Sequence, residues 1–198
     1  MRILVVGASG TIGQAVADAL SGRHDVIRAS RENSDEKVDI MDPASIRALF
    51  ARVGRVDAVA SAAGRAAFKP LSALADEDFE FSLRSKLMGQ VNLVRLGFES
   101  LNDNGSMTCV AGYLSRHPAA GSAAVSLVNA ALEGFGRAAA LEAPRGIRVN
   151  IVSPSWITET LQKLGRPAAG GTPVSVVAQA YVRSIEGSET GQVFDPKP

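Results

Sequence analysis

This chain of 198 residues contains little cysteine and few aromatic residues, and neither sign of charge is in marked excess. Cys109 is the single cysteine, which excludes an intramolecular disulfide framework and fits a reducing compartment. The 21 basic and 20 acidic residues leave a net charge of +1, so no nucleic-acid or membrane-surface partner is expected. No apolar run approaches the roughly 20 residues of a membrane span, and residues 3–6 are too short for a signal-peptide core. We therefore expect a cytoplasmic protein, one domain over residues 1–198, without a metal site.

Short apolar and β-branched runs alternate with longer helical segments along the whole chain. Helical periodicity predicts helices over residues 12–20, 42–52, 119–142 and 174–185, and one long amphipathic helix over 79–101. Strands are predicted over residues 3–6, 25–29, 37–40, 56–61, 106–110, 148–152 and 192–194. Strands that alternate with helices form parallel sheets with right-handed crossovers. The predicted fold class is α/β, a doubly wound parallel sheet with helices on both faces.

A glycine-rich segment joins the first predicted strand to the first predicted helix, and it reads Gly7-Ala8-Ser9-Gly10-Thr11-Ile12-Gly13. In such a segment the first glycine allows a tight turn, the second lets the backbone approach a pyrophosphate, and the third lets helix and strand pack closely. The helix N-terminus adds free N–H groups for a phosphate. Gln14 stands where a Walker loop needs lysine, which argues against that alternative. The segment predicts a dinucleotide site; a glycine turn that serves packing alone is the alternative.

The end of the second predicted strand bears on the choice of dinucleotide. NAD-selective sites usually place a carboxylate there for the ribose 2′-hydroxyl. Here the chain reads Arg28-Ala29-Ser30-Arg31, and the first carboxylate is Glu32. Ser30 and Arg31 are suited to a 2′-phosphate, the arginine through a charge-assisted fork. We expect NADP(H) to be preferred over NAD(H).

Four further segments resemble the short-chain dehydrogenase/reductase (SDR) family, and the resemblance covers nearly the whole chain. They are Asp39-Ile40, Ser61-Ala62-Ala63-Gly64, the stretch from Gly146 to Pro154, and Thr190-Gly191-Gln192-Val193. The resemblance implies a Rossmann fold with strand order 3-2-1-4-5-6-7 and an adenine ring held at Asp39 and Ile40. It also implies that Ser61, Ala62, Ala63 and Gly64 line the cofactor, and that Pro154 and Ile157 lie near the nicotinamide.

The catalytic residues of the family are missing from the positions where alignment expects them. Ala111 takes the place of the serine, Val125 of the tyrosine, Asn129 of the lysine and Lys86 of the asparagine. The last two identities are exchanged, and in the family these positions face each other near the cofactor ribose. The exchange predicts that a cation and an amide remain there with their helices swapped. The alternative is that Lys86 lies on a solvated helix face and Asn129 on the surface.

A proton source for hydride chemistry then has to come from elsewhere. The candidates are Tyr113 and Ser115, just beyond the fifth predicted strand, and His117 in the same loop. A nearby lysine and the positive nicotinamide would lower the pKa of Tyr113. The alternatives are an aromatic pocket wall for Tyr113 and a surface loop position for His117. Trp156 is predicted to wall the substrate pocket or to serve packing.

The leading function is an NADP(H)-dependent oxidoreductase that acts on a carbonyl or alcohol with an atypical site. The alternative is a dinucleotide-binding protein without turnover, such as a redox sensor or scaffold, and a third reading is an isomerase or epimerase. The partners expected are a small-molecule substrate and a second copy of the chain, as a homodimer or homotetramer through the two long helices. The residues expected to permit or make that contact are Leu93, Leu96, Ala123, Ala124, Leu127, Ala131, Gly134 and Ala138.

Overall fold

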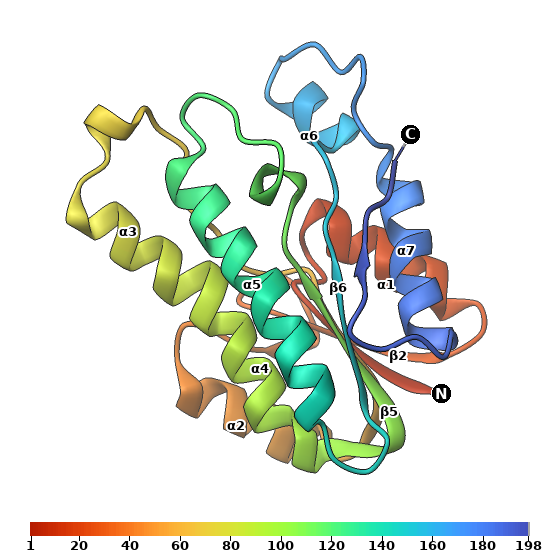
Figure 1. Ribbon diagram of the computed structural model, residues 1–198. Helices are drawn as coiled ribbons and strands as arrows, with labels where there is room; N and C mark the ends of the chain where they lie inside the picture. Colours follow the sequence, from red (N-terminus) through yellow and green to blue (C-terminus); the bar gives the residue numbers. More distant parts are fainter. Residues whose placement is uncertain (198) are drawn as a thin grey trace.

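A seven-stranded parallel sheet forms the centre of the molecule, in the order β3-β2-β1-β4-β5-β6-β7, as the sequence predicts. Figure 1 shows this arrangement in a computed structural model, which describes residues 1–197. The strands are β1 (Arg2–Val6), β2 (Asp25–Ser30), β3 (Glu36–Lys37), β4 (Val56–Ser61), β5 (Leu101–Val110), β6 (Arg148–Val152) and β7 (Val193–Phe194).

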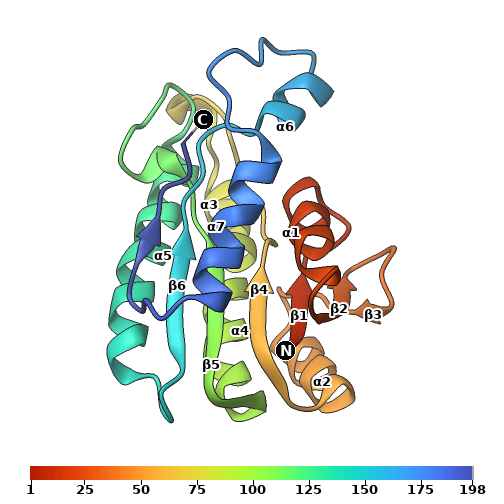
Figure 2. The same ribbon diagram turned by 90° about the vertical axis from the view of Figure 1, so that its right-hand side faces the viewer.

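Helices cover both faces of the sheet (Figure 2). The α-helices are α1 (Thr11–Ser21), α2 (Pro43–Val53), α3 (Asp76–Ser82), α4 (Gly89–Gly97), α5 (Ala123–Glu142), α6 (Thr158–Lys163) and α7 (Val174–Glu186). Helices α1 and α7 pack together on one face, where Val16 and Tyr181 join a buried cluster with Ile3. Helices α2, α4 and α5 cover the other face, through side chains such as Leu49 and Leu132. No helix among the described residues is long and apolar enough to span a bilayer.

The long helix predicted over 79–101 is present, with different ends and an interruption. It begins with α3, passes through the π-helical segment η2 (Leu83–Met88) and continues as α4. A 3₁₀ turn over Phe98–Ser100 follows, and β5 begins at Leu101, five residues earlier than expected. π-Helical turns within α-helices are frequent at functional sites. This one contains Lys86.

Two other predicted elements are shorter than expected for identifiable reasons. The third strand ends at Lys37 rather than residue 40, because a carboxylate oxygen of Asp39 accepts the amide of Met41 at 2.9 Å and turns the chain. Helix α5 begins at Ala123 rather than residue 119, because Gly121 has a φ of +86° and holds the preceding residues in a turn. Helix α6 was not predicted.

Two glycines permit close backbone approaches beside the site. Gly7 has a φ of +86°, and a Cβ there would lie 2.9 Å from the carbonyl carbon of Ala62. Gly64 has a φ of +106°, and a Cβ there would lie 2.9 Å from the Cα of Lys86. Such positions exclude larger residues. The glycine-rich turn, the end of β4 and the π-helical segment are thereby packed against one another.

Candidate active site

Two adjoining cavities lie at the carboxyl ends of the strands, where open α/β sheets bind ligands. The smaller measures about 290 Å³ and the larger about 560 Å³. Ala62 and Gly64, just after β4, line both cavities. A ligand that occupied both cavities would therefore pass the carboxyl end of β4.

Most residues predicted to bind a cofactor line the smaller cavity. These are Gly7, Ser9, Gly10, Ser30, Arg31, Asp39, Ile40, Ala62, Ala63 and Gly64. The N-terminus of α1 faces this turn, and its N-cap residue, Gly10, provides no side-chain cap. The free N–H groups of the first turn are the feature that binds phosphate at helix N-termini. Sequence reasoning missed Arg65, a second arginine of this cavity that no motif singles out.

Three predicted cofactor residues do not line either cavity. The hydroxyl of Thr11 accepts a hydrogen bond of 3.2 Å from the Lys163 ammonium. Gly13 serves packing, because a Cβ there would lie only 2.1 Å from the carbonyl oxygen of Gly7. Ser61 is fully buried, and its carbonyl accepts the Tyr181 hydroxyl at 2.8 Å. Gly13 and Ser61 therefore serve the packing of the glycine-rich turn and β4 through their backbone.

The larger cavity brings the remaining predicted residues together. Ile12, Lys86, Tyr113, Asn129, Pro154 and Ile157 line it. Phe68 and Trp156 also contribute, and their rings pack edge to face with centroids 5.5 Å apart. The sequence gives no signal for Phe68, because it lies in an irregular loop. Val125, where the resemblance places the tyrosine of the family, adds an apolar wall.

Lys86 projects from the π-helical segment into the larger cavity. Its ammonium donates to the carbonyl oxygen of Ala111 at 3.3 Å. The side-chain amide of Gln90 pairs with both backbone groups of Val110 at 2.8 and 2.7 Å, which fixes this end of β5 beside the lysine. Burial lowers the pKa of Lys86 to about 8. The pKa of this lysine is therefore lower than that of a lysine on a solvated face.

Asn129 faces the same cavity from α5, and its side chain is almost completely buried. Its Oδ1 has no hydrogen-bond partner within residues 1–197. A Cβ built on Gly112 would lie 2.8 Å from Asn129 Nδ2, whereas Ala111 packs in the core. Position 112, rather than Ala111, is therefore the one whose side chain would point at Asn129. A buried amide oxygen without a partner favours a bound hydroxyl or water at this place.

The three predicted proton sources occupy different environments. Tyr113 lines the larger cavity and stacks on His117, with ring centroids 4.1 Å apart. Ser115 does not line it; its hydroxyl donates to the carboxylate of Glu133 at 2.7 Å. Glu133 is buried and also accepts a 2.9 Å hydrogen bond from Ser153. This carboxylate, which sequence reasoning missed, anchors the turn that presents Tyr113.

The residues present fit an NAD(P) cofactor. The close approach of Gly7 to Ala62 and the uncapped α1 N-terminus suit a pyrophosphate. Arg31 and Arg65 line the smaller cavity, and the buried Oδ1 of Asn129 in the larger cavity is free to accept a hydrogen bond from a bound hydroxyl. Within residues 1–197 no group of three or more His, Cys, Asp or Glu side chains is placed to hold a metal.

Comparisons with known proteins agree with this geometry. A family model described as enoyl-(acyl carrier protein) reductase matches residues 7–186. The 3-oxoacyl-(acyl-carrier-protein) reductase of Escherichia coli (strain K12) is 27% identical over 78% of this chain and 72% of its own length. The crystal structure of the protein lin1944 from Listeria innocua is 42% identical, covers 98% of both chains and superposes with a TM-score of 0.95. A small-chain dehydrogenase in complex with NADPH is 27% identical, covers 98% of this chain and 95% of its own, and has a TM-score of 0.86. The chain belongs to the short-chain dehydrogenase/reductase family of NAD(P)-linked oxidoreductases.

Proposed function

We propose that this chain is an NADP(H)-dependent oxidoreductase that acts on a carbonyl or alcohol with an atypical active site. The observation that carries the proposal is the arrangement of Lys86 and the unpartnered Asn129 Oδ1 on the wall of one cavity. That pair keeps a cation and an amide in the cavity, with the two helices exchanged relative to the usual order in the family. The Lys86 ammonium contacts the end of β5 instead of lying on a solvated helix face, which supports the proposal.

The proposed roles follow from the surroundings of each residue. When bound, NADP(H) supplies or accepts the hydride. The ammonium of Lys86 polarises a carbonyl oxygen and donates a proton to it, because burial brings its pKa to about 8. Asn129 Oδ1 accepts a hydrogen bond from a ribose hydroxyl or a water beside the lysine. Tyr113, or a water that it holds, is the second candidate proton donor.

The preference for NADP(H) rests on charge around the smaller cavity. Arg31 and Arg65 both line it, and no carboxylate stands at the end of β2. The nearest carboxylate, that of Glu32, lies 4.0 Å from the Arg31 guanidinium, and both side chains are largely exposed. An exposed pair at that distance contributes little, so the guanidinium stays available to a 2′-phosphate. The NADPH bound by the small-chain dehydrogenase relative supports the same assignment.

The experiment that tests the proposal measures binding and turnover separately. Titration calorimetry with NADPH and NADH establishes cofactor binding, and NADPH oxidation is then followed over a panel of ketones and aldehydes. We expect micromolar NADPH binding and slow turnover that falls at least tenfold in Lys86→Met, in the range of a lost general acid. Turnover on the order of 10 s⁻¹ that Lys86→Met and Tyr113→Phe leave unchanged would place the active site elsewhere.

A dinucleotide-binding protein without turnover is the second candidate, and one observation favours it. Neither Ala111 nor Val125, where alignment expects the family's serine and tyrosine, carries a hydroxyl, and neither does the neighbouring Gly112. NADPH binding with no oxidation across the panel would support this candidate. Lys86 and Asn129 would then hold the nucleotide without chemistry.

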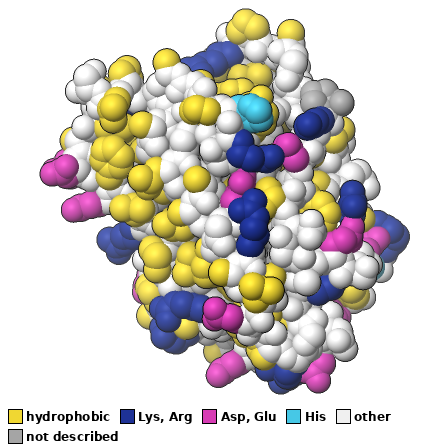
Figure 3. Space-filling model, viewed as in Figure 1, with side chains coloured by type: hydrophobic (Ala, Val, Ile, Leu, Met, Phe, Trp, Pro, Cys, Tyr) yellow, Lys and Arg dark blue, Asp and Glu magenta, His cyan; other side chains and the backbone are white. Residues whose placement is uncertain are grey.

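We propose that residues 1–198 act as one domain in the cytoplasm and pair with a second copy through α4 and α5. Figure 3 shows apolar side chains gathered over α3, α4 and α5. The exposed stripe of α5 includes Leu127, Gly134 and Leu141, and Ala131 is partly exposed. Leu93 and Ala124, expected to take part, are instead fully buried. Leu93 and Leu96 pack in or on the core cluster between α4 and the sheet.

A further inference from the structure

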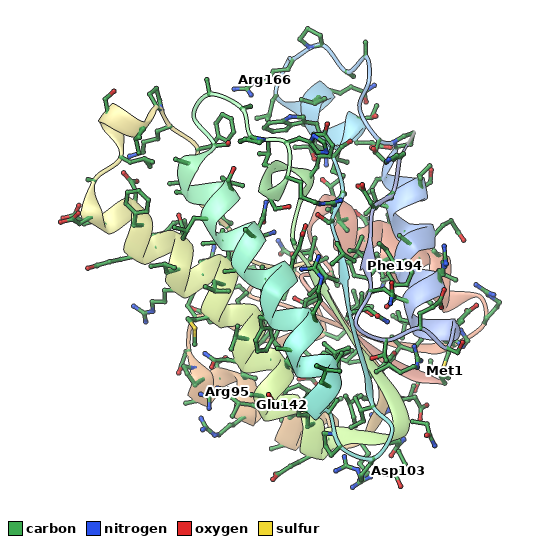
Figure 4. The ribbon with its side chains drawn as sticks, viewed as in Figure 1. Met1, Arg95, Asp103, Glu142, Arg166 and Phe194 are labelled. Atoms are coloured by element: carbon green, nitrogen blue, oxygen red, sulfur yellow. The ribbon has the colours of Figure 1, made fainter. Side chains whose placement is uncertain are left out.

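Arg166 lies at the mouth of the larger cavity, in the loop that follows α6. It lines the cavity, and its side chain is exposed. Figure 4 shows it directed from this loop toward the segment that precedes α5. Among residues 1–197 it has no ion-pair partner, whereas many other arginines of the chain do. The neighbouring cation, Lys163, is turned to the Thr11 hydroxyl instead.

The charges around the cavity are of one sign. Lys86 and Arg166 are the cationic residues of its lining, and no aspartate or glutamate of the described chain lines it. Lys86 lies deep, against the end of β5, while Arg166 lies at the rim. The wall between them is mainly apolar and includes Phe68, Leu114, Val125, Trp156 and Leu164.

From this arrangement we propose that the substrate carries a carboxylate, which Arg166 binds at the rim while the reacting carbonyl lies at Lys86. The inference rests on the proposed function and adds the substrate class. A planar guanidinium matches a carboxylate through two parallel hydrogen bonds. Because one arginine at the rim has no second cation beside it in the lining, a monoanion suits the site better than a phosphate. The apolar wall accommodates a hydrocarbon or aryl body between the two polar groups.

The test uses Trp156, the single tryptophan of the chain and part of the cavity wall, as a fluorescent reporter. The probes are 4-oxo-4-phenylbutyrate, which carries a carboxylate, a ketone and an aryl group, and its uncharged primary amide. Each is titrated against the full-length protein saturated with NADP⁺ and against the protein without cofactor. We expect the acid to bind about tenfold more tightly than the amide, the effect of one charged hydrogen-bonded pair.

Three variants locate the effect. Arg166→Gln should remove the preference for the acid, and Arg166→Lys should keep part of it. Arg55→Gln, which removes the same charge just before β4 and away from both cavities, should leave the preference unchanged. Equal or absent binding of acid and amide to the natural protein would overturn the proposal, as would a preference that persists in Arg166→Gln. Failure of NADP⁺ to bind would overturn the proposed function instead. The titration without cofactor still compares the affinities for acid and amide, so it tests the role of Arg166 independently.

Discussion

The side chain of Asn129 occupies the space that a side chain at position 112 would need, since a Cβ on Gly112 would lie 2.8 Å from Asn129 Nδ2. The two positions are therefore coupled. A serine at 112 requires a different residue, or a different rotamer, at 129. The atypical site is a packed arrangement in which glycine and asparagine fit each other, and reverting one position alone does not restore the usual geometry.

This coupling predicts the result of restoring the family residues. Gly112→Ser alone should lower stability and leave generic ketone reduction unchanged, because the serine meets the Asn129 amide. The triple change Gly112→Ser, Val125→Tyr and Asn129→Lys should raise it by roughly 10²-fold or more, the value of a positioned general acid. NADPH oxidation with a ketone panel measures the activity of the single and the triple variant. The matched variant places the serine at Ala111 instead, which borders the cavity but packs its side chain in the core cluster, and should gain less activity. Equal gains from both triple variants would contradict the assignment of position 112.

Much of this arrangement can be predicted from the sequence, and the remainder depends on tertiary contacts. The strand order and the gathering of Gly7, Asp39 and Gly64 at one cavity follow from motifs with fixed local geometry. The choice between Ala111 and Gly112 does not, because both residues line the larger cavity and only the structure shows that a side chain at 112 would meet Asn129. The Phe68–Trp156 pair joins two irregular loops, and no periodicity predicts such a contact.

The two arginines of the smaller cavity predict that the 2′-phosphate strengthens NADPH binding relative to NADH binding. Arg31→Ala and Arg65→Ala should each weaken NADPH binding by about tenfold, because each removes one charged hydrogen-bonding partner. NADH binding should change little. Calorimetry with both cofactors measures the two effects, and Arg84→Ala, which lines neither cavity, is the charge-matched control. NADH bound as tightly as NADPH by the natural protein would contradict the cofactor assignment.

The exposed stripe of α5 predicts how assembly responds to charge. Leu127 is 47% exposed, and a Cβ built on Gly134 would meet no atom within 4 Å, so both positions are available to a second copy. Leu127→Asp should convert the proposed dimer or tetramer to a monomer at micromolar concentration, because an isologous interface receives the buried charge twice. Light scattering measures the mass. A natural protein that is already monomeric would refute the interface.

Lys86 predicts the pH dependence of reduction. The protonated lysine is the form that polarises a carbonyl, and burial lowers its pKa to about 8. The kcat/KM for ketone reduction should therefore be constant below this pH and fall as the pH rises through it. Lys86→Met should be slow and lose this descending limb. A limb that persists unchanged in Lys86→Met would assign the titration to another group, with Tyr113 as the first to test.

The same lysine predicts an opposition between stability and activity. Because the pKa of Lys86 is lower in the folded protein than its ordinary value of 10.5, the unfolded chain binds more protons between pH 8 and 10.5, and stability should rise with pH across that window. The lowering corresponds to at most about 3 kcal/mol, and the solvent contact that Lys86 keeps reduces this to about 1–2 kcal/mol. Lys86→Met removes the cost of burying the charge, so its free energy of unfolding at pH 7 should exceed that of the natural protein.

Urea unfolding at pH 7 and pH 10 measures this effect in both proteins. The difference between Lys86→Met and the natural protein should shrink at pH 10, where the folded protein holds Lys86 largely neutral. Lys37→Met, at an exposed position of β3, is the control and should show no such convergence. A Lys86→Met variant less stable than the natural protein at pH 7 would show that the lysine stabilises the fold through its contact with Ala111, and its retention would then need no functional explanation.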